Sequence, residues 1–233
     1  MTDTAQPSRA LVSQWAACGI AAAAARFVPV PLLDDVIRGR AVQVAVSRTL
    51  QTHGRDYPVA RLEPLWAERA GRGFGRYLRA AVLRVVLWPV RKYRAIFGAV
   101  RGVPQDVIHV LLLARTVDRR LARGELTDPD PRRLGAQARN IRRAFDEAMR
   151  GMDLRLLNAA LADALSHGRG LTSAAVAYAR RWFARPDTQP DLAPDGAVGA
   201  GTQRVADVLR RPEITRLLDQ FDARVATALA DAA

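Results

Sequence analysis

Residues 26–40, RFVPVPLLDDVIRGR, decide how the first part of the chain folds. Pro29 and Pro31 push the residues before them toward extended backbone, so an Ala-rich helix that starts near Ser8 is expected to end near Phe27. Pro31 suits the first position of a second helix, because its missing N–H is not needed there. Since helices joined by so short a loop usually pack antiparallel, we expect the chain to open with a helical hairpin.

The adjacent carboxyl groups of Asp34 and Asp35 are the pair that suggests acid–base catalysis. Adjacent helical residues point about 100° apart, so the two groups cannot face each other across a substrate without help from another element. Both lie in the first turn of the second helix, where the helix dipole favours carboxylates, and Asp34 can pair with Arg38. We therefore interpret Pro29, Pro31, Asp34 and Asp35 as a structural hairpin turn.

Composition predicts an all-α fold, a multi-helix bundle. The chain has 233 residues, of which 49% are hydrophobic and only 6% aromatic, and Ala, Leu and Arg, which favour helices, recur throughout. We expect a helical bundle domain over residues 1–184, a Pro/Gly/Asp-rich loop or linker over 185–203, and a C-terminal helix over 204–233 that docks on the bundle. The expected helices are about 8–27, 31–52, 75–100, 103–124, 131–149, 154–166, 171–184 and 204–230, with helical pattern also resuming near Leu62.

Positive charge is concentrated in residues 69–105, which we call the basic segment. It carries nine basic side chains and no acidic one, within a chain of net charge +13. On a helical projection most of its arginines fall within about one third of the circumference, apolar residues lie on the other side, and Trp88 lies near the boundary. This pattern is typical of a helix lying on an anionic membrane. The predicted anionic-partner surface is Arg72, Arg76, Arg79, Arg84, Trp88, Arg91, Lys92, Arg94 and Arg101.

Two other interpretations of the basic segment stay open. It can be an ordinary bundle helix with its arginines in water, or it can bind the phosphates of a nucleic acid without reading the base sequence. Few aromatic side chains and no DNA-binding motif accompany the charge. Nucleic acid is therefore a less favoured partner for the basic segment than a membrane.

Motifs for catalysis and cofactor binding are absent from the sequence. His53, His109 and His167 have no second ligand at metal-binding spacing, and no phosphate-binding loop or nucleophile elbow occurs. Cys18 is the single cysteine and lies in an apolar stretch, as expected of an inert buried thiol. We therefore expect no enzyme activity, no cofactor and no metal.

The N-terminal region is neither a good signal peptide nor a good spanning helix. Asp3 accompanies Arg9 near the start, Gln14 interrupts the apolar stretch, and alanine is only weakly hydrophobic. No run of about 18 residues is free of charge.

Residues 16–46, AACGIAAAAARFVPVPLLDDVIRGRAVQVAV, combine an Ala/Gly-rich helix, a Pro-x-Pro turn, an acidic residue and a second apolar helix. This arrangement resembles bacterial membrane-associated helical domains of unknown function, some of which are attached to GTPases. The chain itself has no GTPase motif. The resemblance implies a cytoplasmic, membrane-associated accessory role without a known activity.

Together these features predict a non-enzymatic helical protein that is cytoplasmic and peripheral on the inner membrane. The basic segment attaches it to the anionic membrane surface, and the protein acts as an accessory or adaptor for an unknown protein partner. A nucleic-acid-associated basic protein and a soluble subunit of a larger assembly are the alternatives.

Overall fold

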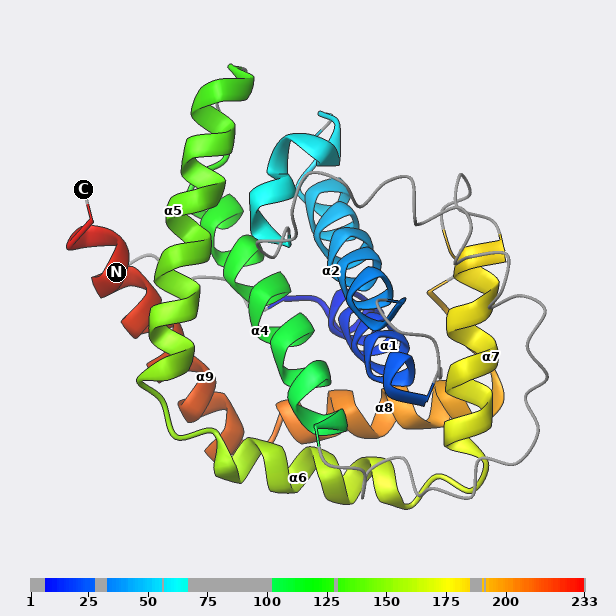
Figure 1. Cartoon of the computed structure of the whole chain (residues 1–233). Helices are drawn as coiled ribbons and strands as arrows, with labels where there is room; N and C mark the ends of the chain where they lie inside the picture. The colour runs from blue at the N-terminus through cyan, green and yellow to red at the C-terminus, as the bar shows by residue number, and fades with distance from the viewer. Residues whose placement is uncertain are drawn as a thin grey trace.

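The computed structural model of the chain describes residues 7–27, 33–55, 57–66, 102–127, 130–184, 190 and 192–232. These residues form helices and contain no strand, so the prediction of an all-α fold is confirmed. Figure 1 shows their arrangement. The elements are α1 (Arg9–Ala24), the 3-10 helix η1 (Ala25–Phe27), α2 (Leu33–Thr52), the 3-10 helix η2 (Val59–Leu65), α4 (Val103–Ala122), α5 (Pro131–Arg150), α6 (Arg155–Ser166), α7 (Leu171–Ala184), α8 (Gly196–Leu209) and α9 (Pro212–Ala230).

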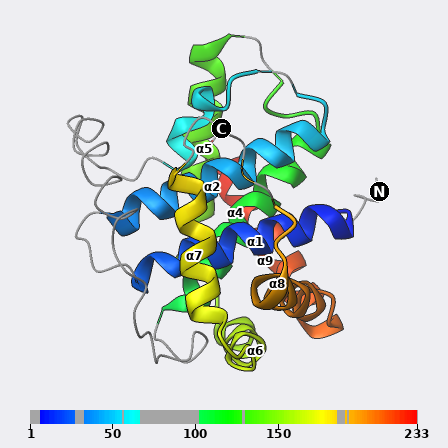
Figure 2. The same cartoon turned by 90° about the vertical axis from the view of Figure 1, so that its right-hand side faces the viewer.

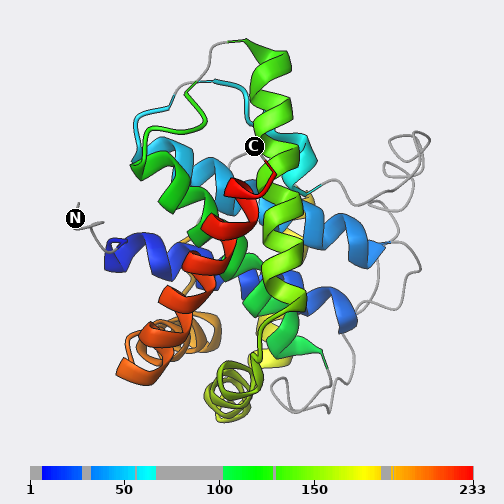
Figure 3. The same ribbon diagram turned by 90° about the vertical axis from the view of Figure 1, so that its left-hand side faces the viewer.

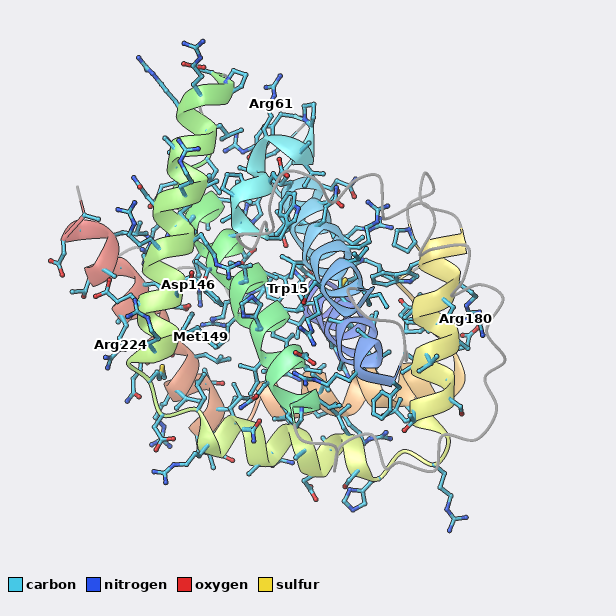
Figure 4. The ribbon with its side chains drawn as sticks, in the orientation of Figure 1. Trp15, Arg61, Asp146, Met149, Arg180 and Arg224 are labelled. Carbon is cyan, nitrogen blue, oxygen red and sulfur yellow. The ribbon has the colours of Figure 1, made fainter. Side chains whose placement is uncertain are left out.

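Helix α1 is the central element and is surrounded by α2, α4, α7 and α8 (Figure 2). Residues 15–25 are all buried, and most of them are alanine, so neighbouring helices can approach closely. At Gly19 a Cβ atom would lie 3.1 Å from the Cα of Val107 in α4. Trp15, at the centre of Figure 4, donates its indole N–H to Thr49 Oγ1 in α2 at 2.9 Å. The small side chains of α1 therefore make it the core of the protein.

Residues 9–27 are also long and apolar enough to cross a membrane, and 72% of their most apolar window is buried inside the protein. Contacts with four other helices account for that apolar character. A core helix of this composition passes the same length and hydropathy test as a spanning helix.

Helix α4 is the second core helix, and it carries charge into the interior. Asp106, Arg115, Asp118, Arg119 and Arg120 are all buried. Each of these side chains is paired: the contacts reach η1, α2, α9 and the loops after α2 and α4. The charges of α4 therefore join parts of the chain that lie far apart in the sequence.

Helix α5 packs on η2 with one part of its length and on α9 with another. Asp130 caps its first turn by accepting the backbone N–H of Arg132 at 2.9 Å, and Pro131 occupies the first helical position. The rings of Phe145 and Phe221 meet edge to face with centroids 5.7 Å apart, which fixes α9 against α5.

Several helix limits agree with the sequence prediction because local signals set them. Ser8 caps α1 by accepting the backbone N–H of Leu11 at 3.2 Å. Helices α5, α6 and α7 match the expected ranges to within a residue. The expected helix over 75–100 lies outside the described residues.

Other limits differ from the prediction. The region near Leu62 is the 3-10 helix η2, which contains Pro64. Residues 196–203, expected in a loop, belong to α8. Gly201 of this helix packs closely against Ile20 and Leu171, where a larger residue would crowd both side chains. The expected single helix over 204–230 is divided between α8 and α9, because Pro212 begins a new helix.

Candidate functional site

Most residues of the predicted sites lie outside the described part of the chain. Pro29 and Pro31 of the hairpin turn lie outside it, and so does the side chain of Asp34. The predicted anionic-partner surface also lies outside: Arg72, Arg76, Arg79, Arg84, Trp88, Arg91, Lys92, Arg94 and Arg101. Asp35 is described, and so are residues that flank these stretches.

Asp35 lies in the first turn of α2 with an exposed side chain. Its Oδ1 accepts a hydrogen bond from Arg38 Nη1 at 3.3 Å, an i,i+3 pair. The sequence suggested a pair between Arg38 and Asp34, so the described contact comes from the neighbouring carboxylate. An exposed pair of this kind stabilises a helix by only a few tenths of a kcal/mol.

Arg38 also belongs to a cluster that we call the charged corner, formed by Arg26, Arg38 and Asp106. Arg26 comes from η1, Arg38 from α2, and Asp106 from the first turn of α4. The Arg26 guanidinium binds the carboxylate through Nε and Nη2, and the Nη2–Oδ1 distance is 3.0 Å. Arg38 Nε lies 3.4 Å from the same Oδ1. The Asp106 side chain is 9% exposed, so the two arginines cover it almost completely.

Gly102 makes the charged corner possible. It adopts a left-handed conformation with φ +95°, which favours glycine, and it precedes the first residue of α4. A Cβ atom at Gly102 would lie 2.5 Å from the Arg26 guanidinium carbon, so any larger residue would displace that side chain. Asp106 is further favoured by the positive end of the α4 dipole.

The charged corner joins three helices near their ends: η1, α2 and α4. The connection 28–32 between η1 and α2 starts one residue after Phe27, and the basic segment reaches the corner at Gly102. In Figure 2 the end of α1, the start of α2 and the start of α4 lie at the same side of the molecule. The corner therefore joins the start of α4, which follows the basic segment in the sequence, to η1 and α2.

His109 lies one turn further along α4. Its ring meets Phe145 edge to face, with centroids 5.2 Å apart. Burial lowers the pKa of His109 to about 4; the positive charges of Arg142 and Arg38 act in the same direction, and Asp146 opposes them. The imidazole is therefore neutral at physiological pH.

His53 and Asp118 form a histidine–carboxylate pair with a 2.8 Å contact between Nε2 and Oδ1. Such a pair is part of many hydrolase sites, but in the described ranges no hydroxyl or thiol nucleophile is hydrogen-bonded to it. Cys18 is fully buried, and burial raises its pKa, which keeps the thiol protonated. The pair joins the residue after α2 to α4 and acts as a structural contact.

The three histidines do not converge. His53 meets Asp118, His109 meets Phe145, and exposed His167 contacts the Asp163 carbonyl through Nδ1 at 2.8 Å. Among the described residues no group of three or more His, Cys, Asp and Glu side chains is placed to hold a metal ion.

Sequence reasoning did not find the charged corner. Arg26 and Asp106 are 80 residues apart, so no local spacing connects them. One feature of the sequence distinguishes Asp106 of the charged corner: it is the first acidic residue after the basic segment.

No protein-family model, curated protein or solved structure matches this chain.

Proposed function

We propose that this protein is a non-enzymatic helical accessory protein that attaches peripherally to the cytoplasmic face of an anionic membrane through its basic segment. The observation that carries the proposal is the segment itself: 37 consecutive residues with nine basic side chains, no acidic one, and apolar and aromatic residues between them. Each basic residue near an anionic surface contributes about 1 kcal/mol, so half of them suffice for reversible attachment.

Two features of the described residues support this proposal. The apolar surface of α1 is used in the protein core, so attachment does not require α1 to leave the fold. The charged corner holds one end of the basic segment against the body through Gly102, so a segment lying on the membrane keeps the helical body close to the surface. The rest of the body is then free to meet a protein partner, which is the adaptor role.

Liposome flotation of the full chain tests the attachment. We expect the protein to float with phosphatidylglycerol-containing liposomes at low salt, to stay behind with phosphatidylcholine alone, and to dissociate as KCl is raised. Changing Arg76, Arg79 and Arg84 to Glu should weaken binding by about 100-fold or more, because three attractive contacts of about 1 kcal/mol each are lost.

The matched control changes Arg169, Arg211 and Arg216 to Glu. These residues are exposed in the described part of the chain. Their substitution changes the net charge by the same amount as the three substitutions in the basic segment. The control should keep most of its binding. Equal losses in both variants, or a wild-type protein recovered only in the soluble fraction, would overturn the proposal. A duplex DNA shift assay with the same variants tests the nucleic-acid alternative for the basic segment.

A further inference from the structure

Helix α5 carries a line of arginines on its outer side, which we call the arginine ridge: Arg132, Arg139, Arg143 and Arg150. All four are exposed. Their spacing of seven, four and seven residues places them within about 40° of one another around the helix. The buried side chains of α5 occupy the opposite side: Leu134, Ala138, Ile141, Ala144, Phe145 and Ala148. The ridge therefore faces away from the core along the length of the helix.

The charge of the ridge is only partly balanced by acidic residues of its own helix. Residues 131–145 contain five arginines and no acidic residue, and the two acidic residues of α5, Asp146 and Glu147, lie between Arg143 and Arg150. Arg142, beside the ridge, is engaged by Asp146 and by the Leu65 carbonyl at 2.7 Å. Within the described part of the chain, Arg132, Arg139 and Arg143 take part in no ion pair.

The excess of arginine over acidic residues in α5 is not explained by the high arginine content of the whole chain, because the adjacent helix α9 does not share it. It lies beside α5 on the face seen in Figure 3. Its arginines, Arg216 and Arg224, are accompanied by Glu213, Asp219 and Asp222. Two neighbouring surface helices of one protein thus differ in charge: α9 mixes both signs along its length, whereas α5 has no acidic residue between Arg132 and Arg143.

The chemistry of the ridge distinguishes between classes of anionic partner. A helix that binds a membrane interface needs an apolar face for the lipid, and the apolar face of α5 is in the core. A protein interface needs buried aromatic or aliphatic anchors, whereas in the described residues the exposed large hydrophobic side chain is Leu156, on α6. Interfaces with nucleic acid are more polar and strongly positive, and arginine binds phosphate with two parallel hydrogen bonds.

We propose that the arginine ridge binds the phosphate backbone of a double-stranded nucleic acid without reading its base sequence. From Arg132 to Arg150 the helix rises about 27 Å, which spans several successive phosphates. A single strand fits less well, because proteins that bind single strands stack the bases on aromatic side chains, and the exposed side of α5 has none. This site is on a different element from the basic segment and does not depend on the proposed membrane attachment.

The test measures binding of the full chain to short duplex DNA and duplex RNA of unrelated sequences by fluorescence anisotropy at several KCl concentrations. Changing Arg132, Arg139 and Arg143 to Gln should weaken binding 10- to 100-fold at low salt. It should also make the slope of log Kobs against log [KCl] less steep by about 3, one for each phosphate contact removed. The losses should be similar for all sequences.

Three comparisons make the result decisive. Changing Arg169, Arg211 and Arg216 to Gln removes the same charge elsewhere and should leave the slope unchanged. The ridge substitutions should have the same effect in a protein that already carries the Arg76, Arg79 and Arg84 to Glu changes. Circular dichroism should give equal thermal unfolding for the ridge variant and wild type, because the substituted side chains are exposed.

The proposal is overturned if wild-type protein does not bind duplexes, if both triple-Gln variants lose affinity equally, or if the ridge variant loses liposome binding and keeps duplex binding. The last result would assign the ridge to lipid headgroups. A failure of liposome flotation with intact duplex binding would instead reject the membrane proposal alone.

Discussion

Single residues of α4 show how a core helix of this protein carries charge. A buried charge without a partner costs several kcal/mol, so each one has to be met by an opposite charge or by hydrogen bonds. Asp106 is covered by Arg26 and Arg38, and Asp118 is met by His53. These partners come from other elements, so the charged residues can be buried only when the surrounding helices are in place.

His109 makes stability depend on pH. Its pKa is lowered from 6.5 to about 4 in the folded protein, so below pH 6.5 the unfolded chain binds a proton that the folded protein does not. Above pH 6.5 the imidazole is neutral in both states, and the titration of His109 costs no stability. As the pH falls toward 4, protonation of the unfolded chain lowers the free energy of unfolding. The full size of this effect is about 3 kcal/mol in the free energy of unfolding. Urea unfolding of wild type and His109→Gln at pH 7 and pH 4.5 measures it.

The stability difference between wild type and His109→Gln should shrink toward the lower pH, because only wild type loses this contribution. Acidic residues titrate in both proteins and cancel in the comparison. His167→Gln is the control, since His167 is exposed, and its stability should follow that of wild type. Parallel pH dependence of wild type and His109→Gln would contradict the assignment.

At the scale of the element, the central position of α1 depends on the size of its residues. Alanine and glycine allow α4 to approach α1 closely, as the 3.1 Å distance from a Cβ atom at Gly19 to Val107 Cα demonstrates. Glycine in a helix normally costs about 1 kcal/mol relative to alanine, so the close contact has to offset that cost.

Gly19 and Gly39 form a matched pair that tests this contact. Gly19→Val should lower the free energy of unfolding by about 2 kcal/mol, because its side chain would overlap the backbone of α4. At Gly39, in α2, a Cβ atom would have open space around it, with no other atom within 4 Å, so Gly39→Ala should raise the free energy of unfolding by about 1 kcal/mol. Chemical denaturation measures both. A neutral Gly19→Val substitution would show that α1 and α4 separate easily.

At the scale of the whole molecule, α9 is joined to α4 by charge and to α5 by aromatic contact. Arg115 Nη2 lies 2.8 Å from Asp222 Oδ2, and Arg119 Nε lies 3.2 Å from the same oxygen. Asp219 also contacts Arg115 at 3.1 Å but is 60% exposed, whereas Asp222 is 14% exposed. Of the two carboxylates that join α9 to α4, Asp222 is therefore the better shielded from water.

Asp222→Asn should lower the free energy of unfolding by about 2–3 kcal/mol, because Arg115 and Arg119 would lose their shared counter-charge in a buried position. Asp219→Asn should change it by less than about 1 kcal/mol, since exposed ion pairs contribute little. Thermal or urea unfolding at neutral pH distinguishes the two. Equal effects of both substitutions would mean that water reaches the Asp222 pairs freely.

The sequence by itself determined the all-α class and many helix limits, because these depend on neighbouring residues. Ser8 and Asp130 cap their helices, and Pro131 begins α5 as its type predicts. The concentration of basic residues in 69–105 is likewise a property of the sequence alone. Local spacing carries all of this information.

Only the tertiary structure decided which faces of the helices meet. It put the apolar α1 in the protein core, made a helix of the Gly-rich residues 196–203, and joined Arg26 to Asp106 across 80 residues. It also left the arginine ridge of α5 on the surface by burying the opposite side of the helix. The physical reason is that burial and long-range ion pairing depend on the positions of helices relative to one another, and residue spacing along the chain does not specify those positions.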